Sequence, residues 1–61
     1  MSPGVQELRD GMNRLRGVLF SAVEAVGLEA KQENALKGLI RALSYDAQAN
    51  IEAALRRHEE F

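Results

Sequence analysis

The residues best suited to chemistry lie on one stripe in the second half of the chain. Five polar or aromatic residues recur there at steps of three or four, namely Asn34, Lys37, Arg41, Tyr45 and Gln48. In a helix this spacing places the five side chains on one face. Two cations, an aromatic ring and two amides suit an anionic, base-bearing small molecule, because cations bind phosphate and a ring stacks on a base. The sequence therefore predicts a ligand-binding stripe, with an ordinary solvated helix face as the alternative.

Little else in the chain points to chemistry. There is no cysteine, and the single histidine, His58, lies near the last residue, so neither a nucleophilic triad nor a zinc site is expected. The acidic pairs Glu29/Glu33 and Glu59/Glu60 are interpreted as solvated faces. We expect a protein that is not an enzyme and that uses no metal or cofactor.

The glycines do not form a nucleotide-binding loop. Gly11, Gly17 and Gly38 fall inside predicted helices and lack the spacing of a phosphate-binding loop. A glycine in a helix interior costs ~1 kcal/mol relative to alanine. We interpret Gly11 and Gly38 as points where helices approach closely.

Two heptad patterns predict the elements that carry this stripe. Apolar residues at alternating steps of three and four form a first seam: Val5, Leu8, Met12, Leu15, Leu19, Ala22 and Val26. A second seam at the same steps consists of Leu36, Ile40, Leu43, Ala47, Asn50 and Ala54. Such spacing is typical of packed helices and excludes strand alternation. The ligand-binding stripe lies roughly opposite the second seam.

The predicted helices run from about residue 5 to 26 and from 29 to 57. They turn at Gly27, a residue that readily adopts the left-handed conformation after a helix. Residues 1–4 are predicted to be a disordered leader, and residues 5–61 a single domain. Ser44, Tyr45 and Asp46 have the weakest helix propensity in the second helix, so a kink there is the alternative to a continuous helix.

The small size of the chain predicts self-association. A core built from 61 residues supplies only ~3–5 kcal/mol, and no disulfide can add to it. Both apolar stripes are wider than a hairpin can cover, and the surplus needs another chain. The predicted fold is all-α, an antiparallel two-helix hairpin assembling into a homo-oligomeric helical bundle.

Two residues bear on that assembly. Asn50 in the second seam is interpreted either as a buried polar residue that fixes the register or as an exposed seam edge. Phe20 falls on the polar side of the first seam, where an exposed ring would contact another subunit. A different helix phase is the alternative for Phe20.

The charge balance and hydropathy exclude two partner classes. A net charge of −1 gives no footprint for general nucleic-acid binding. No apolar run approaches the ~20 residues that cross a bilayer, and the first residues lack the pattern of a signal peptide. We expect a cytoplasmic protein with no membrane partner.

The second half of the chain resembles a known family. The segment Leu28-Glu29-Ala30-Lys31-Gln32-Glu33, followed by residues 36–50, is similar to the small phage-encoded helical proteins that sequester cyclic nucleotides and so blunt bacterial CBASS immunity. In that family the aromatic residue near the middle of this helix belongs to a Met-Trp pair, where this chain has Tyr45-Asp46. The resemblance implies a homo-oligomer that binds nucleotides between subunits without catalysis, in the cytoplasm of the host cell.

Two functions follow as hypotheses. The first is a non-enzymatic sponge that sequesters an anionic nucleotide-type signalling molecule between subunits, as a phage anti-defence protein would. The second is a structural or adaptor bundle acting through protein–protein contacts. A DNA-binding regulator is the weakest alternative, because neither helix carries a dense basic face.

Overall fold

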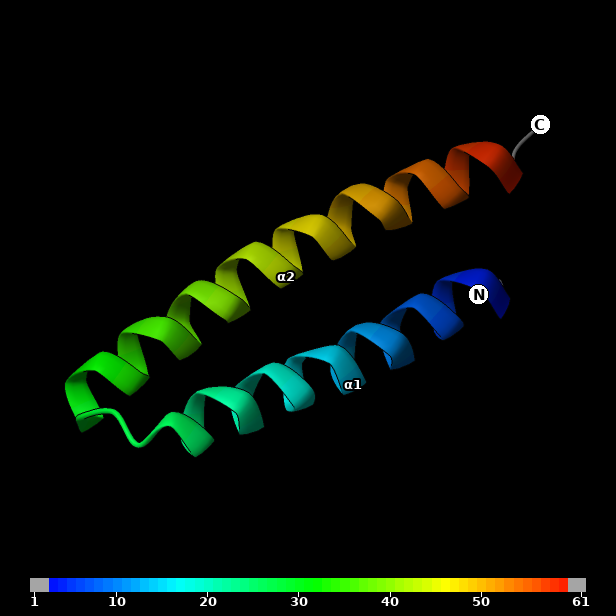
Figure 1. Ribbon diagram of the computed structural model, residues 1–61. Coiled ribbons are helices and arrows are strands. Elements are labelled where there is room, and N and C mark those ends of the chain that lie inside the picture. The colour runs from blue at the N-terminus through cyan, green and yellow to red at the C-terminus, as the bar shows by residue number, and fades with distance from the viewer. Residues whose placement is uncertain (1–2, 60–61) are drawn as a thin grey trace.

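The protein is an antiparallel hairpin of two long helices. The computed structural model describes residues 3–59, in which α1 (Pro3–Val26) and α2 (Ala30–Glu59) lie side by side. The turn is at one end of the hairpin and both chain ends are at the other (Figure 1). The prediction of an all-helical hairpin is confirmed.

The first helix begins earlier than predicted. Pro3 and Gly4, assigned to the leader, belong to α1. Proline is favoured in the first helical turn because its missing N–H would have no helical partner there. Met1 and Ser2 lie outside the described residues.

The turn forms where the glycine predicted it. Gly27 has a φ of 76°, and its N–H donates to the Glu24 carbonyl at 3.3 Å. An L-residue with a side chain rarely adopts this backbone conformation. α2 starts three residues later, at Ala30, and the Glu33 N–H donates to the Glu29 carbonyl at 2.9 Å.

The second helix is continuous through its weakest stretch. Ser44 and Asp46 both lie within α2, which runs unbroken from Ala30 to Glu59, so the prediction of a continuous helix is confirmed. The Ser44 hydroxyl donates to the Arg41 carbonyl at 3.2 Å, which keeps this polar side chain bonded within the helix.

The most deeply buried side chains of the hairpin include more polar groups than apolar ones. Val5, 1% exposed, is the one buried apolar residue among those described, and Arg16 and Ser44 are the buried polar ones. Leu43 is 69% exposed. Most residues of both seams are exposed in the hairpin, in line with the expectation that a hairpin covers only part of each stripe.

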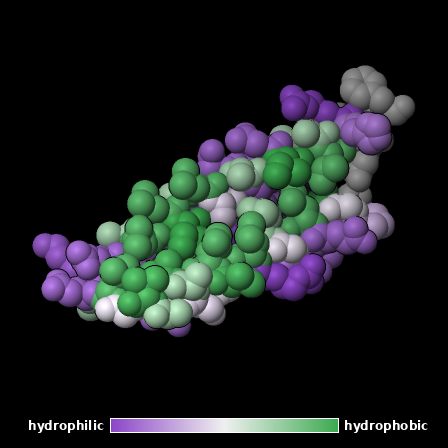
Figure 2. Space-filling view, viewed as in Figure 1, coloured by the Kyte–Doolittle hydropathy of each residue, from purple (hydrophilic) through white to green (hydrophobic). Residues whose placement is uncertain are grey.

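The two seams lie side by side on one face of the hairpin. Figure 2 shows apolar residues gathered in a band along both helices. The exposed large apolar residues of the seams and their flanks are named here the apolar face: Leu15, Val18, Leu19 and Val26 of α1, and Leu36, Leu39, Leu43 and Ile51 of α2. Each seam points sideways from the line that joins the helix axes, and the two point to the same side.

Two interpretations of single residues change with this packing. A Cβ at Gly38 would meet nothing within 4 Å, and one at Gly11 would meet only the Arg14 guanidinium, at 4.0 Å. The prediction that the two helices approach each other closely at Gly11 and Gly38 is therefore wrong. Asn50 is exposed in the hairpin, so it is not a buried polar residue of the single chain.

Candidate functional site

A layer of hydrogen-bonded polar side chains joins the two helices. We call polar layer the residues that bridge them: Arg9, Arg16 and Glu24 of α1, and Lys37, Ser44, Gln48 and Glu52 of α2. The bridges occur at three levels, near the open end, in the middle and near the turn. Polar groups between helices are stabilised only when they are paired, so the layer fixes which residues face each other.

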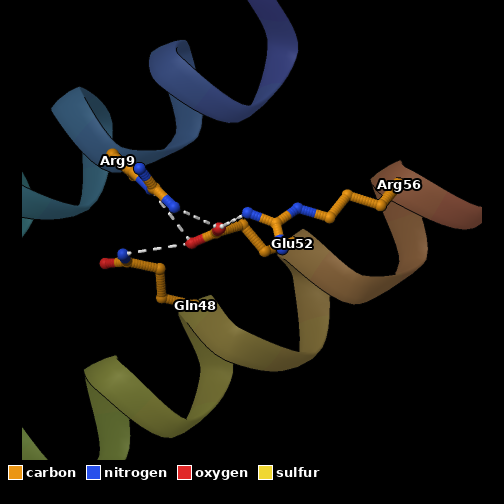
Figure 3. A network of polar contacts seen from close by, with 4 residues as sticks. All are labelled: Arg9, Gln48, Glu52 and Arg56. Atoms are coloured by element: carbon orange, nitrogen blue, oxygen red, sulfur yellow. Dashed lines mark hydrogen bonds and ion pairs between the residues drawn. The ribbon is translucent and has the colours of Figure 1, made fainter. Parts of the chain in front are cut away.

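The bridge near the open end is an ion pair with two supports. Arg9 Nη2 lies 2.6 Å from Glu52 Oε1, and Arg9 Nε donates to Glu52 Oε2 at 3.2 Å. From their own helix, Arg56 donates to Oε1 at 3.0 Å and Gln48 to Oε2 at 3.5 Å (Figure 3). The hydrogen bond from Arg9, reinforced by those of its neighbours, lowers the pKa of Glu52 and outweighs the opposing effect of burial.

This bridge predicts an acid-sensitive part of the hairpin's stability. The pKa of Glu52 is lower in the folded chain than in the unfolded chain. The ionised carboxylate therefore stabilises the fold at pH values above its unfolded-state pKa, and this stabilisation is lost as the pH falls through its folded-state pKa. We expect the melting temperature of the wild type to decrease when the pH is lowered past about 4. Glu52→Gln should lower the melting temperature at pH 7 and flatten the acid dependence. A Glu52→Gln protein with an unchanged acid profile would show that other carboxylates control it.

The middle bridge buries a positive charge among neutral groups. Arg16 is 5% exposed, and its Nη1 donates to Gln48 Oε1 at 3.2 Å and to Ser44 Oγ at 3.4 Å. Its Nη2 donates to Asn13 Oδ1, and the guanidinium lies 3.9 Å from the centroid of the Tyr45 ring. No carboxylate forms an ion pair with Arg16 in the described part of the chain. Neutral oxygens and a π face therefore balance this charge.

The bridge near the turn combines an ion pair with an aromatic ring. Lys37 Nζ lies 2.8 Å from Glu24 Oε1 and 3.7 Å from Glu33 Oε2. The hydrogen bond to Glu24 raises the pKa of Lys37. Phe20 is half-buried, with Lys37 Nζ at 5.9 Å and the Arg41 guanidinium at 5.2 Å from its ring centroid. The expectation of an exposed Phe20 is wrong, because the ring packs under cations of its own chain.

The residues of the ligand-binding stripe divide into two groups. Lys37 and Gln48 are half-buried and bonded to α1, so they belong to the polar layer. Asn34, Arg41 and Tyr45 are exposed, although Arg41 and Tyr45 also contact α1 side chains. The stripe thus faces the edge of the helix contact, and ligand binding there stays a prediction.

Other candidate sites in the described residues are sparse. A shallow apolar hollow near the turn is lined by Leu28, Gln32, Ala35 and Leu36. Over residues 3–59, no three histidine, cysteine or acidic side chains gather as metal ligands would. Neither described helix combines the length and apolar character needed to cross a bilayer.

Comparison with known proteins identifies no similar protein. The chain matches no protein-family model, no curated protein and no solved structure.

Proposed function

We propose that this protein is a non-enzymatic, homo-oligomeric helical module that works through protein–protein contacts, as a structural or adaptor bundle does. The observation that carries this proposal is the inverted burial of the hairpin. Charged and amide side chains lie between the helices, while eight large apolar side chains form the apolar face on the outside. Contiguous apolar patches on this scale mark contact surfaces in proteins.

The energetics of a single hairpin favour the same proposal. Full burial of one valine contributes only ~1.5–3 kcal/mol, and Val5 is the one apolar side chain so buried among the described residues. Fixing the backbone of each residue costs ~1–2 kcal/mol. Covering the apolar face would supply the burial that the hairpin lacks.

Thermal melting at different protein concentrations tests the proposal. A self-associated chain gains stability by mass action, so its melting temperature rises with concentration. We expect a rise of several degrees over a hundredfold increase in concentration. A melting temperature that is independent of concentration, with full helix content, would contradict self-association.

A second candidate function is sequestration of an anionic nucleotide-type ligand between subunits. The observation that favours it is the pair Arg41 and Tyr45. Both side chains are exposed, and they lie four residues apart and so on the same side of α2. Arg41 forms no ion pair with a carboxylate among the described residues, so its charge is available to an anion. This candidate function agrees with the resemblance to phage anti-defence sponges. It places the site of action of the protein in the cytoplasm of a host cell.

Nucleotide binding by three variants tests the second candidate. Arg41→Ala should weaken binding of a cyclic dinucleotide ten- to a hundredfold, because a guanidinium holds phosphate through charge-assisted bonds worth about 1.5–3 kcal/mol. Tyr45→Ala should weaken it less, and Tyr45→Phe should be nearly neutral because stacking needs only the ring. Calorimetric titration measures the affinities. Wild-type protein that binds no mono-, di- or cyclic nucleotide would remove this candidate.

A further inference from the structure

We infer that two copies of the chain pair face to face as a parallel dimer, with turn beside turn, so that the turn half of each apolar face covers the turn half of the other. The inference rests on the proposed self-association and specifies its geometry. Two observations support it: the position of the exposed apolar residues along the hairpin, and the level at which two exposed charges lie.

The exposed apolar surface lies in the turn half of the hairpin, which is defined here as residues 15–43. Seven of the eight residues of the apolar face belong to this half, and Ile51 is the one beyond it among those described. In the open half, by contrast, Val5 is buried, and Leu8 and Leu55 are half-buried. The open half therefore covers most of its own large apolar side chains, whereas the turn half needs a partner.

A second copy is the partner whose surface matches the turn half. The seven residues are each about half exposed, which leaves on the order of 500 Å² of apolar surface uncovered per chain. Contact between two turn halves would bury on the order of 1,000 Å², close to the lower limit of a specific interface. A parallel pair achieves this contact with the hairpins aligned along their whole length. An antiparallel pair achieves it only when the copies are shifted until their open halves project, which leaves Ile51 uncovered.

Two exposed charges lie at the outer edges of the hairpin. Arg14 precedes Arg16 by two residues, and Asp46 follows Ser44 by two, while Arg16 and Ser44 are bonded to each other between the helices. Two residues correspond to about 200° of helix rotation, so Arg14 and Asp46 point away from the opposite helix, one at each edge. Neither forms an ion pair with another residue of the described chain.

A parallel pair brings these two opposite charges together. Arg9 pairs with Glu52. Arg14 follows Arg9 by five residues and Asp46 precedes Glu52 by six, so in antiparallel helices the two lie within about one residue, or ~1.5 Å, of the same level. The twofold axis of a parallel pair runs along the hairpin, so α1 of one copy lies over α2 of the other and every residue keeps its level. Arg14 of each copy then lies beside Asp46 of the other, at the same edge.

An antiparallel pair with aligned ends would bring like charges together instead. Arg14 and Asp46 are each within two residues of the midpoints of α1 (Pro3–Val26) and α2 (Ala30–Glu59). A twofold axis across the middle of the hairpin lays α1 on α1 and α2 on α2, so each of these charges would meet its own counterpart. Like charges placed side by side are unfavourable, and this favours the parallel pair.

Distances between spin labels test the direction of the pair. The chain has no cysteine, so Lys31→Cys, Ala42→Cys and Ala53→Cys each carry a single label. The three positions are exposed and eleven residues apart, about three helical turns, so they lie on one side of α2, and none belongs to the apolar face. Circular dichroism first establishes that each labelled protein keeps the helix content of the wild type. Pulsed dipolar spectroscopy then reports the distance between the two copies.

The expected result is the same distance, within a few ångströms, for all three labels, because each label keeps its level in a parallel dimer. In any antiparallel dimer the separation along the helix axis would differ by at least roughly 30 Å between the nearest and the farthest label pair, since successive positions are about 16 Å apart along α2. That pattern, or more than two coupled spins, would overturn the parallel dimer while leaving self-association intact. If no label showed a dipolar signal at concentrations where the protein is helical, the proposed self-association would fall as well.

Discussion

Leu43→Asp is expected to unfold the protein rather than merely to weaken it. In a solitary hairpin Leu43 is 69% exposed, and a surface substitution would change stability by at most about 0.5 kcal/mol. In a self-associated chain the same residue is covered, and burying an unpaired carboxylate costs several kcal/mol. That cost matches the ~3–5 kcal/mol that a domain of this size can supply. Circular dichroism should therefore show loss of helix and of the cooperative thermal transition.

Ala42→Asp is the matched control for this prediction. Ala42 is the adjacent residue of α2 and is exposed on the side away from the apolar face. The control introduces the same charge with a similar loss of helix propensity, so it should stay folded. A folded, monomeric Leu43→Asp protein would show that the hairpin keeps its fold without a covered apolar face.

Arg16→Ala should give the second-largest loss of stability. Arg16 is the one residue bonded to Asn13, Ser44 and Gln48 together, and it also stacks on Tyr45. Its removal leaves the buried Ser44 Oγ and the half-buried Gln48 Oε1 without this donor, at ~1–3 kcal/mol, and takes away the packing of its aliphatic stem. We expect the melting temperature to fall by roughly 10 °C, since 1 kcal/mol corresponds to about 4–8 °C in a domain this small.

Two further variants separate the role of Arg16 from that of charge alone. Arg14→Ala removes the same charge from an exposed position of α1 and should leave the melting temperature nearly unchanged. Arg16→Lys keeps the charge but loses the planar fork that reaches several oxygens at once, so it should restore only part of the stability. Equal melting temperatures for Arg14→Ala and Arg16→Ala would mean that the middle bridge does not hold the helices together.

The sequence was sufficient to predict the helices and their turn. The heptad steps from Val5 to Val26 and from Leu36 to Ala54 identify two helices, because a period near 3.5 is incompatible with strands. The positive φ of Gly27 follows from the residue type at the end of the first pattern. These are local properties, determined by residues close in the chain.

The relative rotation of the helices could not be predicted in the same way. A heptad seam indicates which side of each helix is apolar, yet it does not say whether that side faces the other helix or another chain. Pairing of Arg9 with Glu52, 43 residues apart, fixes the rotation and turns Leu43 outward. One feature of the sequence did point to the side of α1 that faces α2: Arg9 and Arg16 are seven residues apart and therefore lie on the same side of α1.

In the candidate site, too, the pattern within one helix predicts the position of each residue but not its contacts with the other helix. The spacing of Lys37, Arg41 and Tyr45 correctly places them on one side of α2, whereas their contacts depend on what α1 presents to them. Phe20 and Arg16 supply the ring and the guanidinium that meet these residues. A pattern within one helix cannot show such a contact, because it contains no information about the neighbouring helix.

Sedimentation velocity of the wild type, combined with circular dichroism on the same samples, tests the central claim most directly. If the apolar face holds the fold together by contact with another copy, every helical species at micromolar concentration should sediment as an oligomer, and helix content should fall on dilution as the oligomer dissociates. A fully helical species that sediments as a 6.7 kDa monomer at all concentrations would contradict the account.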